Sequence, residues 1–314
     1  MRPAHVVVRQ SWPRIRVAAR WVWFIMVTFF VVAYVRRNGE LITGTLGSID
    51  WSVLTVTAAV TVVGKVTLSA QCGAITSHLG HRFAWRQTFW MYSASDVVKY
   101  VPGGIWNAVA RVKLYADAGL ARGTATRAFA LEKFWQVLGA VATGVMALAP
   151  LLHRSLFGSD PGAVVVTVEV ALVLLLWTLL TWFGAHRITG VRPGTRLVVR
   201  SMVEQIVMAV ALGAGLAIPL AVVDAGVDPL TAVGAFSIGR GVGYVAVFAP
   251  AGIGVREVVT IWALGRGIDT DLALVALGVN RVMTFVADLG SFGAGVVIRR
   301  RGSGLGTLSA EEAT

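Results

Sequence analysis

Long apolar blocks separated by short polar segments dominate this chain of 314 residues. The six clearest blocks cover 21–35, 51–75, 127–152, 163–185, 197–223 and 271–298. All but the first are long enough to cross the ~30 Å hydrocarbon core of a bilayer as helices. Trp21 and Trp23 can anchor the shorter first block at one membrane interface. The pattern therefore predicts an all-α integral membrane protein with about six transmembrane helices.

Two further stretches, near 89–115 and 229–265, are interrupted by helix breakers. The breakers are Pro102, Gly103 and Gly104 in the first stretch, and Pro250, Gly252 and Gly254 in the second. Proline removes a backbone donor and stops a helix, while glycine permits a tight turn. Irregular backbone is not tolerated against lipid, so such breaks must be buried in protein or line a wet cavity. We expect each stretch to form a re-entrant helical hairpin.

The two breaks also suggest that the chain repeats. Pro250 follows Pro102 by 148 positions, and the same shift carries the apolar blocks of the first half onto those of the second. Equivalent blocks would cross the membrane in opposite directions, as in inverted-topology transporters. The expected parts are a basic segment 1–20, membrane repeats 21–152 and 163–298, and a disordered tail 299–314.

Charge and composition agree with a membrane protein. The chain is 56% hydrophobic and 14% charged, with a formal net charge of +12. In a soluble protein this charge would suggest nucleic acid, but here the basic residues lie between apolar blocks and first indicate topology. Nineteen of the 28 lysines and arginines fall on the side of the N-terminus, which predicts that both termini are cytoplasmic. We expect no nucleic-acid partner.

No enzyme or metal signature accompanies the apolar blocks. The single cysteine, Cys72, excludes an internal disulfide and a cysteine-based metal site. The chain contains no Walker loop, nucleophile elbow or zinc-protease motif. We therefore expect no metal, no cofactor and no ATP hydrolysis.

The breaks themselves suggest an anion site. Helices that begin at Ile105 and Ile253 would present free N–H groups near the membrane midplane, and such ends favour phosphate. Arg111 and Arg256 follow the two breaks and can clamp a phosphate with a bidentate fork, and Asn107 and Glu257 lie beside them. The alternative for Arg111 is that it only extends to the cytoplasmic interface.

Ionisable residues within the apolar blocks are the other candidates. Glu132, Lys133, Arg281 and Asp288 lie in the equivalent blocks 127–152 and 271–298. A charge buried in a membrane is costly and indicates function by default. Glu132 must find a partner, with Arg111 or Arg281 as candidates. A structural ion pair between the halves is the competing interpretation.

Several other charged residues lie near the hairpins or alone. Asp96 and Lys99, three positions apart, can pair with each other, or Asp96 can exchange protons. Arg240 faces the second hairpin and can meet an anion. Lys65 and Glu204 have no evident partner in the sequence.

The residues around both breaks resemble a known family. They are Lys99-Tyr100-Val101-Pro102-Gly103-Gly104, Arg111, Gly119, Ala130-Leu131-Glu132-Lys133-Phe134 and Pro250-Ala251-Gly252-Ile253-Gly254-Val255-Arg256-Glu257. They resemble the flippase-like membrane domain of lysylphosphatidylglycerol synthetase. The chain departs from that family at Ala251, where glycine is usual, and at Trp106. It also lacks the soluble aminoacyl-transferase domain of fused members, so lysine transfer is not expected.

The resemblance implies movement of a lipid with a polar head, such as an aminoacyl-phospholipid or a polyprenyl-phosphate-linked sugar, between leaflets of a bacterial or archaeal cell membrane. The leading hypothesis is a flippase rather than an enzyme, in which Arg111 and Arg256 hold phosphate and Glu132 and Glu257 balance charge or carry protons. One alternative is an integral-membrane glycosyltransferase or lipid-modifying enzyme that uses Asp96 or Glu132 as its base. The other is a non-transporting scaffold for a cell-envelope glycosyltransferase, which is also a candidate partner.

Overall fold

The computed structural model describes residues 49–101, 105–246, 249, 252–265 and 268–311, together with five single positions before residue 49, and only the backbone of 301–311. These residues form helices and no strand. The helices are α3 (Trp51–His78), α4 (Trp85–Val97), the 3₁₀ turn η1 (Val98–Tyr100), α5 (Trp106–Asp117), α6 (Arg122–Ala147), α7 (Ala149–Phe157), α8 (Ala163–Thr189), α9 (Thr195–Val222), α10 (Pro229–Val245), α11 (Val255–Leu264) and α12 (Thr270–Glu311).

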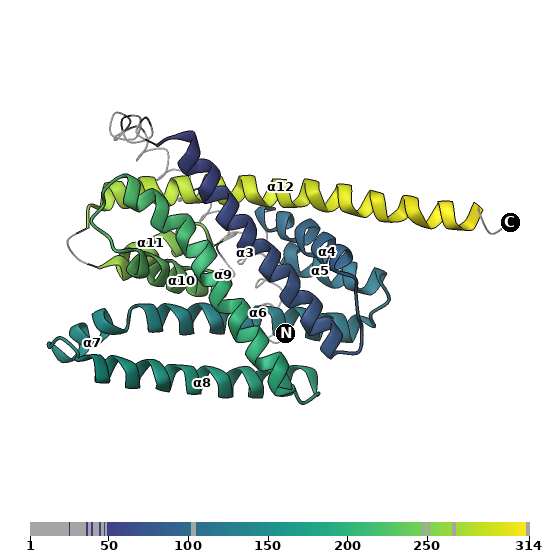
Figure 1. Ribbon diagram of the computed structural model, residues 1–314, viewed down its shortest axis with the longest axis horizontal. Helices are drawn as coiled ribbons and strands as arrows, with labels where there is room; N and C mark the ends of the chain where they lie inside the picture. The colour runs from purple at the N-terminus through teal and green to yellow at the C-terminus, as the bar shows by residue number, and fades with distance from the viewer. Residues whose placement is uncertain are drawn as a thin grey trace, which may run out of the picture.

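Helices α3 and α9 cross at the middle of the molecule, with the other helices arranged around them (Figure 1). At this crossing Gly64 lies under the side chain of Leu212, where a Cβ atom would sit only 2.7 Å from a leucine methyl carbon. Gln205 of α9 also donates a hydrogen bond to Gln71 of α3 at 2.9 Å. Small residues and side-chain hydrogen bonds commonly hold membrane helices together, because burial against lipid gives them no hydrophobic advantage.

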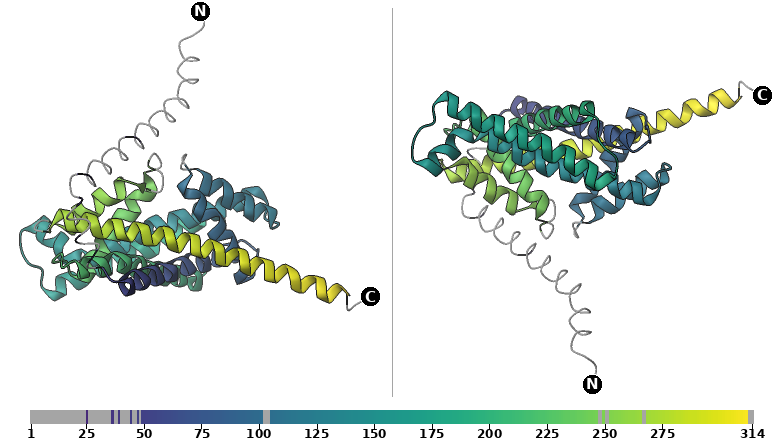
Figure 2. Two further views of the ribbon diagram at one scale, coloured as in Figure 1. Left: turned by 90° about the horizontal axis from the view of Figure 1, so that it is seen from above. Right: turned by 90° about the horizontal axis from the view of Figure 1, so that it is seen from below.

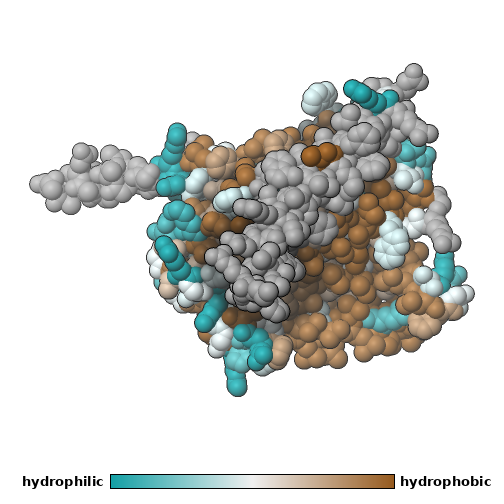
Figure 3. All heavy atoms as spheres, turned by 180° about the vertical axis from the view of Figure 1, so that it is seen from behind, coloured by the Kyte–Doolittle hydropathy of each residue, from teal (hydrophilic) through white to brown (hydrophobic). Residues whose placement is uncertain are grey.

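Four helices are long and apolar enough to cross a membrane: α3, α8, α9 and α12 as far as Arg300. The pair α6 and α7, bent by 69° between them, would make a fifth. Hydrophobic residues fill the middle of the face in Figure 3, while hydrophilic residues collect toward its two ends. The all-helical prediction is confirmed for the described residues, which contain four or five helices long and apolar enough to cross a membrane; the predicted count of about six stays a prediction. The predicted block 21–35 lies almost entirely outside the described residues.

Both broken stretches contain paired helices. The first consists of α4, η1 and α5, and the second of α10 and α11, which contact each other closely. Pro102, Gly103, Gly104 and Pro250 lie outside the described residues. Gly252 and Gly254 have φ values of 70° and 85°, a region that glycine adopts without a steric penalty. The predicted helix starts are close to those observed, since α5 begins at Trp106 and α11 at Val255.

Two pairs of helices have the same spacing along the chain and make corresponding contacts. Helix α4 packs against α12, and α10 packs against α6. Helices α4 and α10 end at Val97 and Val245, and α6 and α12 begin at Arg122 and Thr270, so both intervals are 148 residues. Helix α12 continues to Glu311, into the expected tail, and projects beyond the other helices (Figure 2).

Candidate functional site

A network of two lysines and two aspartates lies in the interior where α3, α4 and α12 meet. Lys65 Nζ lies 2.7 Å from Asp96 and 2.5 Å from Asp288, and Lys99 Nζ lies 3.0 Å and 2.7 Å from the same two carboxylates. Tyr100 donates a 2.7 Å hydrogen bond to Asp288. Each cation bridges both anions, so the four charges cancel. We call this group the lysine–aspartate network.

The network confirms one local prediction and shows what the sequence could not. Asp96 and Lys99 pair as their spacing predicts. Lys65 has two carboxylate partners, so its apparent isolation in the sequence was misleading. Those partners lie 31 and 223 positions along the chain, and no local pattern connects them. Since four mutually paired buried charges leave little reason for a ligand, the network favours a structural role.

Arg111 and Glu132 form a second buried pair, between α5 and α6. Their side chains are each about 1% exposed, and Arg111 Nη1 lies 2.7 Å from Glu132 Oε2. Arg111 also donates to Ser95 Oγ at 2.5 Å and to the carbonyl of Tyr92 at 3.3 Å. Tyr115 donates to the other oxygen of Glu132. The prediction that Glu132 pairs with a basic residue of another helix is confirmed.

This geometry changes the interpretation of Arg111. Its three guanidinium nitrogens already donate to protein acceptors, which include the thiol of Cys72 at 3.0 Å. The ring of Tyr92 lies 4.6 Å from its guanidinium carbon. The contacts favour a structural role for Arg111 over phosphate binding. Asn107 likewise donates to a protein group, the carbonyl of Ser95, at 2.8 Å.

The third pair joins α11 and α12. Arg281 donates to Glu257 at 2.6 Å, which confirms that Arg281 pairs with an acidic residue of another helix. The other oxygen of Glu257 accepts a 2.7 Å hydrogen bond from the backbone N–H of Gly254. Glu257 therefore closes the start of α11 and holds Arg281 at the same time.

Three interior cations remain without a carboxylate within ion-pair distance in the described part of the chain: Lys133, Arg240 and Arg256, which we call the cation cluster. All three lie along one face of α10. Arg256 sits over the ring of Phe236 at 4.0 Å, and Lys133 sits 5.1 Å from the ring centre of Tyr244. These aromatic residues flank Arg240 by one turn on either side. Positive charges from α6 (Lys133), α10 (Arg240) and α11 (Arg256) therefore gather beside two turns of α10.

Arg240 is the least satisfied member of the cation cluster. The residue is about 4% exposed, and none of its three guanidinium nitrogens has a hydrogen-bond partner among the described residues. Among the described residues, Arg256 donates a 3.5 Å hydrogen bond to Asn280, and Lys133 donates to Gln136 at 3.0 Å. A buried guanidinium without an acceptor is strongly unfavourable. The arrangement is suited to an anion with several oxygens.

Close packing of α11 against α10 places Arg256 beside α10. A Cβ atom at Gly239 would lie 2.1 Å from Thr260 Oγ1 and 2.8 Å from the carbonyl oxygen of Arg256, so only glycine allows α11 to approach at this point. Arg240 was singled out in the sequence only as facing the hairpin. Its neighbour Gly239 carries a signal in the sequence as well, since glycine in an apolar helix is typical of close helix packing.

Comparison of the chain with models of known families finds no match, and comparison with curated proteins finds no relative. The described residues contain no group of histidine, cysteine and acidic side chains that could hold a metal ion.

Proposed function

We propose that this protein moves a lipid with an anionic, phosphate-bearing head group between the two leaflets of a bacterial or archaeal cell membrane. The observation that carries the proposal is the cation cluster. Its three positive charges lie inside a largely apolar helical protein, and Arg240 has no acceptor in the described residues. A membrane-buried ionisable group without a partner is a functional site by default.

A phosphate would supply what the cation cluster lacks. Arg240 and Arg256 can each present two parallel N–H donors to phosphate oxygens, and Lys133 adds a third charge. The interior carboxylates Asp96, Asp288, Glu132 and Glu257 are already paired with basic residues, so they would not repel an anion strongly. The lipid tails would remain in the bilayer while the head group crosses beside α10.

The architecture supports transport by an inverted repeat. If α4 is matched to α10 and α6 to α12, the contact of α4 with α12 corresponds to the contact of α10 with α6. The ends of α4 and α10, and the starts of α6 and α12, are each 148 residues apart. The broken stretches then fall at equivalent places in the two halves, where transporters of this kind bind their substrates. We propose that one half rocks against the other to expose the cation cluster to each side in turn, with both termini cytoplasmic.

Leaflet exchange in liposomes tests the proposal. The full-length protein is reconstituted, and tail-labelled phosphatidylglycerol or a labelled polyprenyl phosphate is followed by chemical quenching of the outer leaflet. Loss of a hydrogen bond to a charged group should cost about 1.5–3 kcal/mol, so Arg240→Gln should slow exchange about 10- to 150-fold. Arg256→Lys should also slow it, because a point charge replaces a bidentate fork. The control is Arg154→Gln, which removes a positive charge from an exposed residue that pairs with Asp160 and should leave leaflet exchange unchanged.

The stability of the same variants separates a binding role from a structural one. Burial of the Arg240 charge, which is unpaired among the described residues, destabilises the protein when no lipid is bound. The variant Arg240→Met should therefore unfold at the same or a higher temperature than the wild type, while leaflet exchange is abolished. Normal exchange by both Arg240→Met and Arg240→Gln would refute the site. Conversion of the lipid into a new product, without exchange, would favour a lipid-modifying enzyme instead.

A further inference from the structure

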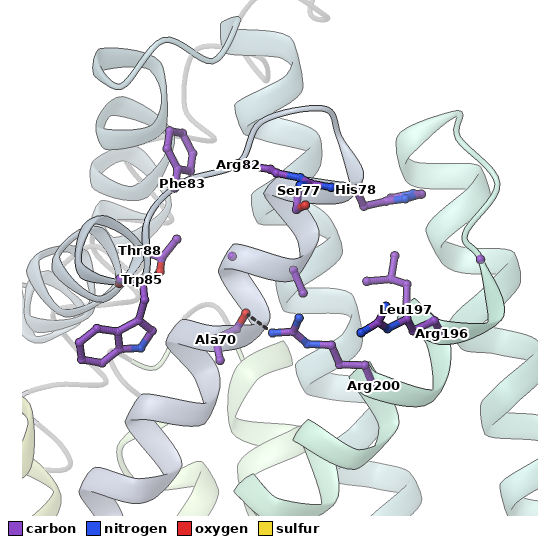
Figure 4. A pocket seen from close by; sticks show the side chains of 13 residues that line it. Ala70, Ser77, His78, Arg82, Phe83, Trp85, Thr88, Arg196, Leu197 and Arg200 are labelled. Carbon is purple, nitrogen blue, oxygen red and sulfur yellow. Dashed lines mark hydrogen bonds between the residues drawn. The ribbon is translucent and has the colours of Figure 1, made fainter.

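A second basic site lies away from the cation cluster, at one end of the α3–α9 crossing. A cavity of about 610 Å³ opens between the end of α3, the start of α4 and the start of α9. This volume is within the usual range for ligand sites. Its walls include Ser77, His78, Arg82, Trp85, Arg196 and Arg200 (Figure 4). The cavity shares no residue with the cation cluster.

The charge on the cavity wall is wholly positive. Three arginines and no acidic residue line it. Arg200 is partly neutralised, since it donates to Glu204 at 2.8 Å and reaches the carbonyl of Ala70 at 3.4 Å. Arg82 and Arg196 have no carboxylate within ion-pair distance among the described residues. The cavity therefore has an uncompensated positive charge.

The backbone adds donors at the same place. Trp85 and Arg196, which line the cavity, belong to the first turns of α4 and α9. The residues before those helices, Ala84 and Gly194, provide no side-chain cap, so first-turn N–H groups are not bonded by one. The two helix starts and the arginines without a carboxylate partner in the described structure together suit a phosphate group.

The position of the cavity indicates a lipid rather than a soluble anion. Helices α3 and α9 are both candidate membrane spans, and the cavity lies at the level where they end and begin. Trp85, which lines the cavity, is about 51% exposed and stacks on Phe89 with ring centres 5.4 Å apart. Tryptophan favours the membrane interface, where its ring contacts both head groups and acyl chains. Basic pockets between spans on the cytoplasmic side are typical sites for anionic lipid head groups.

We propose that this cavity holds the phosphate head group of an anionic lipid of the adjacent leaflet, with Arg82 and Arg196 on the phosphate and Trp85 against the first carbons of an acyl chain. The site is separate from the proposed transport site and does not depend on it. A bound lipid would brace the ends of α3, α4 and α9 against one another.

Native mass spectrometry of the full-length protein, delipidated in detergent and titrated with phosphatidylglycerol, measures the affinity for the first bound lipid. Each basic residue near a membrane surface contributes about 1 kcal/mol, so Arg82→Gln/Arg196→Gln should weaken binding about thirtyfold. Ser77→Trp, which fills the cavity without changing any charge, should weaken it as well. Arg122→Gln/Arg192→Gln removes the same charge from exposed positions that do not line the cavity and should change binding less than threefold.

The variants distinguish a specific site from general attraction to a basic surface. Equal losses from the two double substitutions, or full binding by Ser77→Trp, would overturn the proposal. Wild-type binding of phosphatidylcholine as tight as that of phosphatidylglycerol would also overturn it. Displacement of the lipid by millimolar inorganic phosphate alone would show that a free anion, and not a lipid, occupies the cavity. Loss of leaflet exchange in the Arg240 variants, together with normal exchange by Arg82→Gln/Arg196→Gln, would confirm that the two sites are independent.

Discussion

The pair Arg111–Glu132 gives the sharpest test of how this protein stays folded. The substitution Glu132→Gln keeps the shape of the side chain and an acceptor oxygen, but it removes the charge that neutralises Arg111. Both side chains are about 1% exposed, so water cannot take over that role. Breaking a buried pair from one side typically costs about 3–5 kcal/mol.

Other contacts place the expected cost at the lower end of that range. Arg111 would keep its hydrogen bonds to Ser95 and to the carbonyl of Tyr92, and its contact with the Tyr92 ring, whose centre lies 4.6 Å from the guanidinium carbon. We therefore expect Glu132→Gln to destabilise the protein by about 3 kcal/mol. At about 2–4 °C per kcal/mol, the midpoint of thermal unfolding should fall by roughly 6–12 °C.

Thermal unfolding in detergent, followed by tryptophan fluorescence, measures this shift. The control is Asp117→Asn, which breaks the ion pair between Lys113 and Asp117 on α5. Those side chains are 70% and 57% exposed, so that pair should contribute no more than about 0.5 kcal/mol. The double substitution Arg111→Met/Glu132→Gln should recover part of the stability lost by Glu132→Gln alone, because no charge remains unpaired. An unfolding midpoint for Glu132→Gln within 2 °C of the wild type would refute the reasoning.

Two further predictions concern the network and the topology. Lys65→Met should lower the thermal unfolding midpoint more than Asp117→Asn does, because Lys99 would then be the remaining lysine partner of both Asp96 and Asp288. An unchanged midpoint in the same assay would show that the two carboxylates do not need Lys65. For the topology, a cysteine in place of Gly158 should react with an impermeant maleimide added outside cells. A cysteine in place of Thr195, beyond the other end of α8, should not react. The opposite pattern would reverse the proposed orientation. The natural Cys72 is buried and should give little background.

The hydrophobic pattern was sufficient to place the long helices α3, α8 and α9, but it did not predict the 69° bend that divides block 127–152 into α6 and α7, or the extension of α12 to Glu311. Apolar blocks of about 20 residues predict membrane-crossing helices, because an unbroken helix satisfies its own backbone in lipid. Proline and glycine likewise located the two broken stretches, since their effect on the backbone is local. The sequence also identified Glu132 and Arg281 as charges that require partners, because the cost of burying a charge depends little on which partner is found.

The choice of partners was decided only by the tertiary structure. Lys65 pairs with Asp288 across 223 positions because α3 and α12 happen to bring these faces together, and no periodicity along the chain encodes that meeting. Arg111 and Arg240 have the same side chain, yet packing surrounds Arg111 with acceptors and leaves Arg240 with none among the described residues. Helix formation depends on neighbours along the chain, whereas the environment of a buried charge depends on which helix faces meet. The sequence therefore determined where charges interrupt the apolar segments, and the fold determined which of them are paired among the described residues.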